Sequence, residues 1–118
     1  MTLQSRLLLV LAGLLGAAGI AAAAGASHGD SRNLSSIAMI FLAHAPVLLI
    51  LALVARGRVL PWAGLVLAAG TLVFGLDLAL REWSGHALFA GAAPLGGGAM
   101  ILGWAGLGIA GLLGKSSD

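Results

Sequence analysis

Four apolar segments, each about as long as a helix that crosses a lipid bilayer, limit the possible folds of this chain more than any other feature. They run approximately over residues 7–26, 34–55, 59–80 and 94–114. A helix needs roughly 20 apolar residues to cross the hydrocarbon core, and its backbone must satisfy its own hydrogen bonds there. The sequence therefore predicts a single domain over residues 1–118, an all-α membrane protein with a compact four-helix transmembrane bundle.

The composition excludes the soluble classes. Hydrophobic residues make up 60% of the chain and charged residues 8%, whereas a soluble domain carries about 25% charged residues, and disordered chains are polar. Cysteine is absent, which excludes disulfides, thiolate metal sites and cysteine nucleophiles. The six Lys and Arg residues form no basic patch, so we predict no nucleic-acid partner.

The basic residues divide unequally between the two ends of a four-span topology. One end would carry Arg6, Arg56, Arg58 and Lys115, and the other Arg32 and Arg81 beside Asp30 and Glu82. The positive-inside rule therefore predicts that both termini are cytoplasmic. We expect a multi-pass protein of the bacterial inner (plasma) membrane. The mitochondrial inner membrane is the alternative, and there the termini would face the matrix.

The first segment has a second interpretation. Arg6, the apolar stretch and the small residues 21–27 resemble a secretory signal peptide with its cleavage site. The apolar stretch is longer than that of a usual signal peptide, and three further spans follow closely. We therefore expect an uncleaved first span.

Small residues recur four positions apart along the predicted helices. The pairs are Ala12 and Gly16, Gly64 and Ala68, Ala99 and Gly103, and Gly106 and Ala110. Such rows let helices pack closely in lipid, either within one bundle or between subunits. Residues 87–98 are apolar but rich in glycine. We expect an irregular piece there, extended or part-helical, that lies at the outer interface and leads into the last helix near Pro94. Gly96 and Gly97 would then allow another backbone to approach closely.

His44 is the most informative polar residue, because it lies near the middle of the second span, where ionisable groups are costly. Pro46 cannot donate to the carbonyl of Leu42, so it is expected to kink the helix and free this acceptor. A neutral imidazole bonded to another helix or to that carbonyl is one interpretation. A quinone or lipid headgroup that binds His44 is a second, and a haem or metal ligand is a third.

The other candidate polar residues lie toward the outer end of the predicted bundle. Asp77 and Arg81 are four residues apart, in the orientation that favours an ion pair on a helix. His28 is a further candidate for a ligand or interhelix contact. Zinc could be considered for the outer group of His28, Asp30, Asp77, Glu82 and His86. No two of them have metal-ligand spacing on one helix, so no metal site is predicted.

Several short motifs, taken in order, are similar to those of a known family. They are Gly25-Ala26-Ser27-His28-Gly29, the His-Ala element in Phe41–Ala45, Phe74–Leu80, Leu88-Phe89, the Pro-x-Gly-Gly signature in Ala92–Gly97, and Gly103-Trp104. The chain resembles the domain of unknown function 423 family over residues 7–113. The resemblance implies a small four-helix inner-membrane protein with relatives in bacteria and mitochondria, and it brings no activity, cofactor or catalytic residue.

This sequence departs from the family pattern at two positions. Ser27 is inserted before His28, and Phe41 stands where many members have another histidine. A two-histidine site in the second span is therefore not available, which weakens any metal or haem site based on the resemblance.

We therefore expect a non-catalytic accessory or scaffolding subunit of a larger membrane complex, of which a respiratory complex is one example. Its partners would be membrane lipids and either other membrane subunits or a second copy, and we expect neither enzymatic activity nor a cofactor. One alternative is a lipid- or quinone-binding protein that uses His44. Another is a small transporter, although the first span lacks the membrane-embedded glutamate of the small multidrug transporters.

Overall fold

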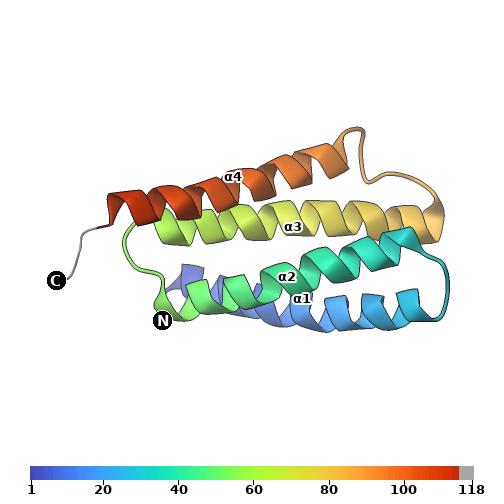
Figure 1. Cartoon of the computed structure of the whole chain (residues 1–118), viewed down its shortest axis with the longest axis horizontal. Coiled ribbons are helices and arrows are strands. Elements are labelled where there is room, and N and C mark those ends of the chain that lie inside the picture. Colours follow the sequence, from blue (N-terminus) through green and yellow to red (C-terminus); the bar gives the residue numbers. More distant parts are fainter. Residues whose placement is uncertain (115–118) are drawn as a thin grey trace.

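The computed structural model describes residues 1–114, which fold into four long helices (Figure 1). They are α1 (Leu3–Ser27), α2 (Arg32–Val54), α3 (Val59–Ser84) and α4 (Ala92–Leu113). All four are long and apolar enough to cross a membrane. The fold class predicted from the sequence, an all-α four-helix transmembrane bundle, is therefore confirmed for the part of the chain that the structure describes. Lys115, which was predicted to lie at the same end as Arg6, Arg56 and Arg58, is outside the described residues.

The helices extend beyond the apolar segments because polar residues at their ends can cap them. Thr2 accepts a hydrogen bond from the backbone N–H of Ser5 (3.0 Å), so α1 begins four residues earlier than predicted. Ser31 caps α2 in the same way, by accepting from the N–H of Leu34 (3.0 Å). Helix α3 continues for a further turn to Ser84, and the next residue, Gly85, has a left-handed backbone (φ 75°) of the kind that terminates helices.

The irregular segment expected before the last helix is present, and the helix begins two residues before the predicted start at Pro94. The chain is non-helical only over residues 85–91, and α4 already begins at Ala92 and includes all three glycines of the 96–98 triplet. Glycine costs about 1 kcal/mol relative to alanine in a helix. Unpaired backbone groups in hydrocarbon cost several kcal/mol each, and avoiding this greater cost keeps the triplet helical. Pro94 lies in the first turn, where it is tolerated.

Helices that follow one another in the sequence pack together. Helix α1 pairs with α2, and α3 pairs with α4, while α2 packs against α3 and α1 meets α3 over a short stretch (Figure 1). Among the described residues, the backbone of α4 comes close to that of α3 only. The start of α1, the α2–α3 loop and the end of α4 lie at one end of the bundle (Figure 1). The other two loops lie at the opposite end.

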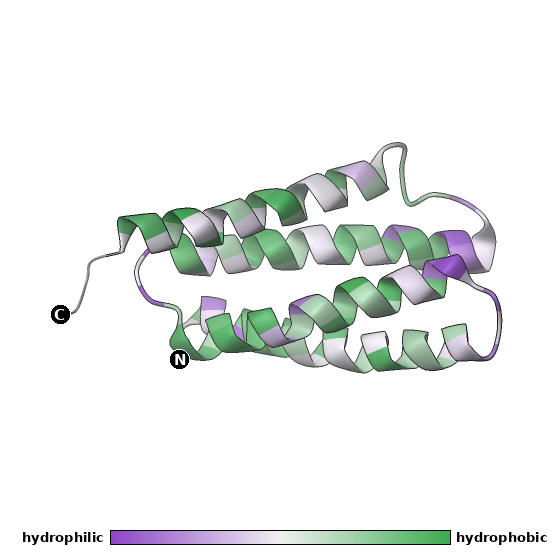
Figure 2. Cartoon of the chain, in the orientation of Figure 1, coloured by the Kyte–Doolittle hydropathy of each residue, from purple (hydrophilic) through white to green (hydrophobic). Residues whose placement is uncertain are grey.

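The core combines large apolar side chains with glycines that allow close helix contact. Leu8, Leu15, Leu48 and Leu67 are almost completely buried. The helices are mostly apolar between their ends (Figure 2), and many large apolar side chains, such as Leu14 and Ile50, are exposed. Hydrophobic burial cannot favour association between helices when the surroundings are equally apolar. The packing therefore depends on close fit.

Helices α3 and α4 cross with their backbones in contact. A Cβ atom built on Gly96 would lie 2.7 Å from the backbone N of Phe74 and 2.8 Å from the carbonyl oxygen of Gly70. On Gly103 it would lie 2.6 Å from Cγ of Leu67. These glycines allow an interhelix distance that no larger residue at the same positions would permit.

The other glycines singled out in the sequence have different surroundings. Gly16 faces Cβ of Ala45 on α2, 3.8 Å from a Cβ built on it. Gly97 has no atom within 4 Å of such a Cβ. No other described helix therefore approaches Gly97, which lies next to Gly96 but on another side of α4.

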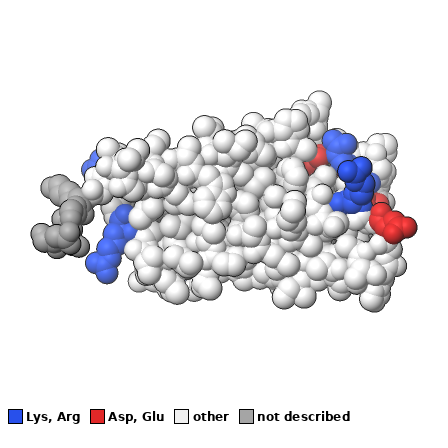
Figure 3. Space-filling view, in the orientation of Figure 1, with Lys and Arg blue, Asp and Glu red and all other residues white. Residues whose placement is uncertain are grey.

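The two ends of the bundle differ in charge (Figure 3). One end carries Arg6, Arg56 and Arg58, and the described residues include no carboxylate there. The other end carries Arg32 and Arg81 together with all three described carboxylates, which belong to Asp30, Asp77 and Glu82.

Candidate functional site

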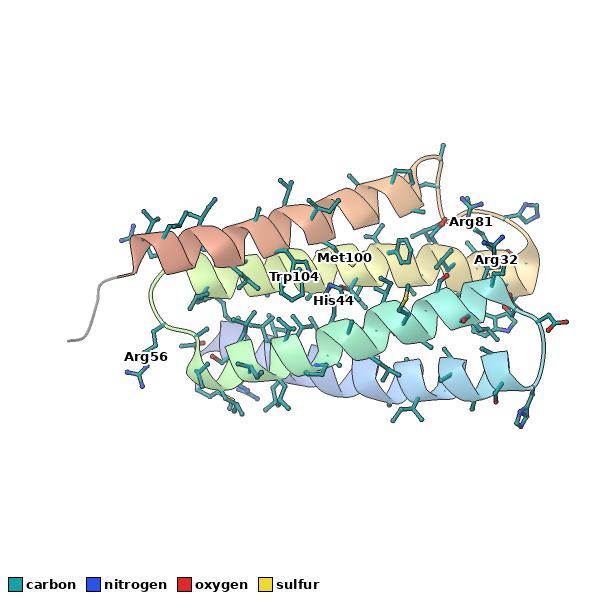
Figure 4. The ribbon with its side chains drawn as sticks, in the orientation of Figure 1. Arg32, His44, Arg56, Arg81, Met100 and Trp104 are labelled. Carbon is teal, nitrogen blue, oxygen red and sulfur yellow. The ribbon has the colours of Figure 1, made fainter. Side chains whose placement is uncertain are left out.

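His44 lies in the middle of the bundle and links α2 to α4 (Figure 4). Its Nδ1 is 2.8 Å from the carbonyl oxygen of Ile40, and its Nε2 is 3.1 Å from Nε1 of Trp104. The two rings meet edge to face, with centroids 5.8 Å apart and an interplanar angle of 66°. This hydrogen bond connects two helices whose backbones do not come close to each other.

The partners of His44 determine its tautomer. The indole N–H of Trp104 can only donate, so Nε2 of His44 must accept, and the proton on Nδ1 is donated to the carbonyl of Ile40. His44 is therefore a neutral imidazole with both nitrogens in use, and it is buried. No nitrogen is left for a metal, haem or quinone while the contact with Trp104 is in place.

The carbonyl that binds His44 is not the one expected from the sequence. Helix α2 continues through Pro46, and the acceptor is Ile40 rather than Leu42. Side chains of a helix point toward its N-terminus and lie over the preceding turn. The imidazole therefore reaches back four residues, to the carbonyl of Ile40.

Trp104 was missed as a partner by sequence reasoning, although a signal was present. Helices α2 and α4 begin at the same end of the bundle, and His44 and Trp104 each lie twelve residues after the first residue of their helix. At 1.5 Å per residue, both lie about 18 Å from that end. Equal depth of a buried acceptor and an indole donor is thus the feature that could have identified the pair.

We predict that His44 and Trp104 are energetically coupled. Trp104→Phe removes the donor and leaves Nε2 unpaired, which should cost about 0.6–1.7 kcal/mol, the range of interhelical hydrogen bonds in membranes. In a double-mutant cycle with His44→Leu, the coupling should be of the same size. Unfolding by SDS in detergent, followed by circular dichroism, measures each variant. Trp62→Phe, at an exposed position, is the control, and strictly additive effects would contradict the prediction.

Asp77 anchors the α3–α4 loop at the end of the bundle opposite the termini (Figure 1). Its carboxylate is fully buried. Oδ2 accepts from Nε of Arg81 (2.8 Å), and Oδ1 accepts from the backbone N–H of Leu88 (2.9 Å). The first contact is the i,i+4 pair that the spacing suggested. The second joins α3 to the loop that precedes α4.

Glu82 connects α3 with the start of α2. Its Oε1 accepts from the hydroxyl of Ser31 (2.5 Å) and from Nδ2 of Asn33 (3.3 Å). The Ser31 hydroxyl therefore has two roles, because it donates to Glu82 and also accepts from the N–H of Leu34. Sequence reasoning missed Ser31 and Asn33. Their contacts with Glu82 depend on how the pair of helices α1 and α2 packs against the pair α3 and α4.

Three of the residues considered for zinc, His28, Asp77 and Glu82, have other partners. His28 is exposed, and its Nδ1 lies 3.2 Å from the hydroxyl oxygen of Ser27. Asp77 and Glu82 bind the groups described above. Within residues 1–114, no three His, Asp or Glu side chains lie in an arrangement that could hold a metal ion.

The polar groups inside the described bundle are paired with one another. Every buried side-chain nitrogen or oxygen in residues 1–114 has a hydrogen-bond partner. This includes the hydroxyl of Thr71, which donates to the carbonyl of Leu67 (2.6 Å). A hydrogen bond between side chains of two helices, or between a helix and a loop, holds these elements in position. The His44, Asp77 and Glu82 contacts therefore join helices or a loop to the bundle.

The four apolar helices, held by paired polar groups, define a small multi-pass membrane protein. The model of the family described as "Protein of unknown function (DUF423)" matches residues 15–97. The match covers most of the chain, so the protein belongs to this family, as the sequence motifs suggested. The matched range includes His44, Asp77, Glu82 and Gly96. No solved structure matches the chain.

Proposed function

We propose that this protein is a non-catalytic accessory or scaffolding subunit that binds other membrane subunits through the open face of α4. We define this face by Gly97, Gly98, Gly108 and Gly111. None of these four glycines has an atom within 4 Å of a Cβ built on it. This observation carries the proposal. It is supported by the backbone of α4, which comes close only to that of α3 among residues 1–114.

Glycines that face only lipid would be unfavourable for a helix. Each costs about 1 kcal/mol relative to alanine and adds no side chain to pack against the lipid. A second helix changes this, because glycine allows backbones to approach closely and gain van der Waals contact. Large residues beside the open face, such as Ile101 and Leu112, are mostly exposed. A covering helix from another subunit would contact both the glycines and these side chains.

The orientation of the subunit follows from its charges. We place the end with Arg6, Arg56 and Arg58 in the cytoplasm, with both termini on that side, in accordance with the positive-inside rule. The proposed location is the bacterial inner membrane. A reporter that is active only in the cytoplasm should then be active when fused to either terminus, and a reporter that is active only outside the cytoplasm should not.

The proposed role predicts that the protein comigrates with one larger membrane complex. The chain is tagged at its native locus and extracted in a mild detergent, and its partners are identified by native gel and mass spectrometry. Gly108→Leu and Gly97→Leu should abolish comigration by blocking close approach, while the bundle stays folded. Gly13→Leu on α1 is the matched control, because Gly13 also has open space around it. Wild-type protein that migrates alone or only with copies of itself would refute the proposal.

A further inference from the structure

An apolar groove of about 410 Å³ runs between α3 and α4 at the basic end of the bundle. Val59, Trp62 and Val66 line its α3 side, Leu102 and Gly106 line its α4 side, and Arg58 lies at its end. The volume is in the range of ligand pockets. Gly103 and Gly106 lie where the groove forms against α3, whereas Gly97, Gly108 and Gly111 of the open face lie on a different side of α4.

Close contact between the helices creates the floor of the groove. A Cβ atom built on Gly106 would lie 3.2 Å from Cβ of Ala63, so the two backbones meet with almost no side chain between them. Larger side chains rise on both sides, and Trp62 and Leu102 are mostly exposed. The result is a long apolar channel that opens to the surrounding lipid.

The end of the groove is strongly positive. Arg58 is exposed, and Arg56 lies two residues away across Gly57, whose left-handed backbone (φ 76°) turns the chain. The described carboxylates all lie at the opposite end of the bundle, so none of them neutralises these two guanidinium groups.

The N-terminus of α3 adds to this positive charge. Arg58 is the N-cap residue of α3, and its side chain makes no capping hydrogen bond. The first N–H groups of a helix have no partner within the helix, and the helix dipole makes this end favourable for phosphate. Arg58 therefore stands beside backbone donors of α3 at the position where the groove begins.

We propose that this groove binds one anionic phospholipid. The phosphate group contacts Arg58 and the N-terminus of α3, and one acyl chain lies along Val66 and Leu102. Trp62 lies between the charged end and the apolar channel, at the level where tryptophan favours the membrane–water interface. Basic residues at the end of an apolar groove between membrane helices match an anionic headgroup joined to a hydrocarbon chain. A zwitterionic lipid has the same chains without the net charge.

The test uses the purified full-length chain in dodecyl maltoside. It is titrated with phosphatidylglycerol or with phosphatidylcholine of the same acyl chains, and bound lipid is counted by native mass spectrometry. We expect phosphatidylglycerol to bind more tightly and with one site per chain. Arg58→Gln should weaken its binding about fivefold, the effect of one basic residue near an anionic lipid. Arg6→Gln, at the same end but outside the groove, should leave the affinity unchanged.

A second pair of variants tests the acyl chain. Val66→Phe should fill the groove and reduce binding of phosphatidylglycerol, whereas Val10→Phe, on the exposed side of α1, should not. Equal affinity for the two lipids, equal effects of Arg58→Gln and Arg6→Gln, or full binding by Val66→Phe would each overturn the proposal. The assay contains only this chain and lipid, so its result is independent of whether the open face of α4 binds another subunit.

Discussion

Gly96→Val is expected to destabilise the bundle by roughly 2–3 kcal/mol, the upper part of the range for overpacked sites. The new Cβ would lie 2.7 Å from the backbone N of Phe74 and 2.8 Å from the carbonyl oxygen of Gly70. Both are backbone atoms, so a change of side-chain rotamer cannot relieve the clash. Helices α3 and α4 would have to separate and lose their close packing.

The neighbouring glycine provides the control for this prediction. Gly97→Val adds the same side chain one residue later, where no atom lies within 4 Å of the new Cβ. It changes helix stability only by the small difference in propensity, so the isolated chain should unfold almost as wild type does. SDS unfolding followed by circular dichroism compares the three proteins. Equal destabilisation by the two variants would show that the backbone contact at Gly96 is not important.

Asp77→Ala is expected to cost about 2–3 kcal/mol, because it removes an ionised acceptor from two hydrogen bonds. The N–H of Leu88 would lose its partner, and Arg81 would lose its ion pair. Arg81 is partly exposed, with 44% of its side-chain surface accessible, so its guanidinium can turn toward water or headgroups. The release of the α3–α4 loop should therefore be the larger consequence.

Two measurements separate these effects. SDS unfolding gives the stability, and limited proteolysis from the side of the α3–α4 loop should show faster cleavage within residues 85–91 of Asp77→Ala. Asp77→Asn keeps an oxygen that can accept from Leu88, so it should protect the loop better than alanine does. Asp30→Ala is the control, because Asp30 is exposed. Unchanged cleavage in Asp77→Ala would contradict the anchoring role.

The sequence was sufficient to predict the four helices, because each corresponds to one apolar segment that is long enough to cross a bilayer. It also suggested the contact of Asp77 with Arg81, since both belong to one helix and lie one turn apart. It did not predict the partner of His44. Trp104 is sixty residues away in the chain, and its contact depends on how far α4 is shifted along the bundle. That shift is set by packing at Gly70, Gly96 and Gly103.

The start of α4 at Ala92, inside a glycine-rich stretch, was harder to place from the sequence for a related reason. Glycine's weak preference for helix is a property of single residues in water, whereas membrane surroundings require hydrogen bonds from every backbone group. The sequence also could not indicate which side of α4 each glycine occupies. Gly96 lies at the crossing with α3, while Gly97 faces open space. Only the position of α3 distinguishes them.

The pairing of consecutive helices bears on the order in which the chain is assembled during synthesis. Helices that have entered the bilayer associate in a later step, and short loops close at a low cost in conformational entropy. The contacts of α1 with α2 can therefore form before α3 has left the ribosome. The contacts that join the two hairpins, such as Phe41 against Gly75 and the pair of His44 and Trp104, require the whole chain. These late contacts include hydrogen bonds between polar side chains, which fix how the two pairs of helices are aligned. The last step of assembly is therefore the one with the greatest specificity.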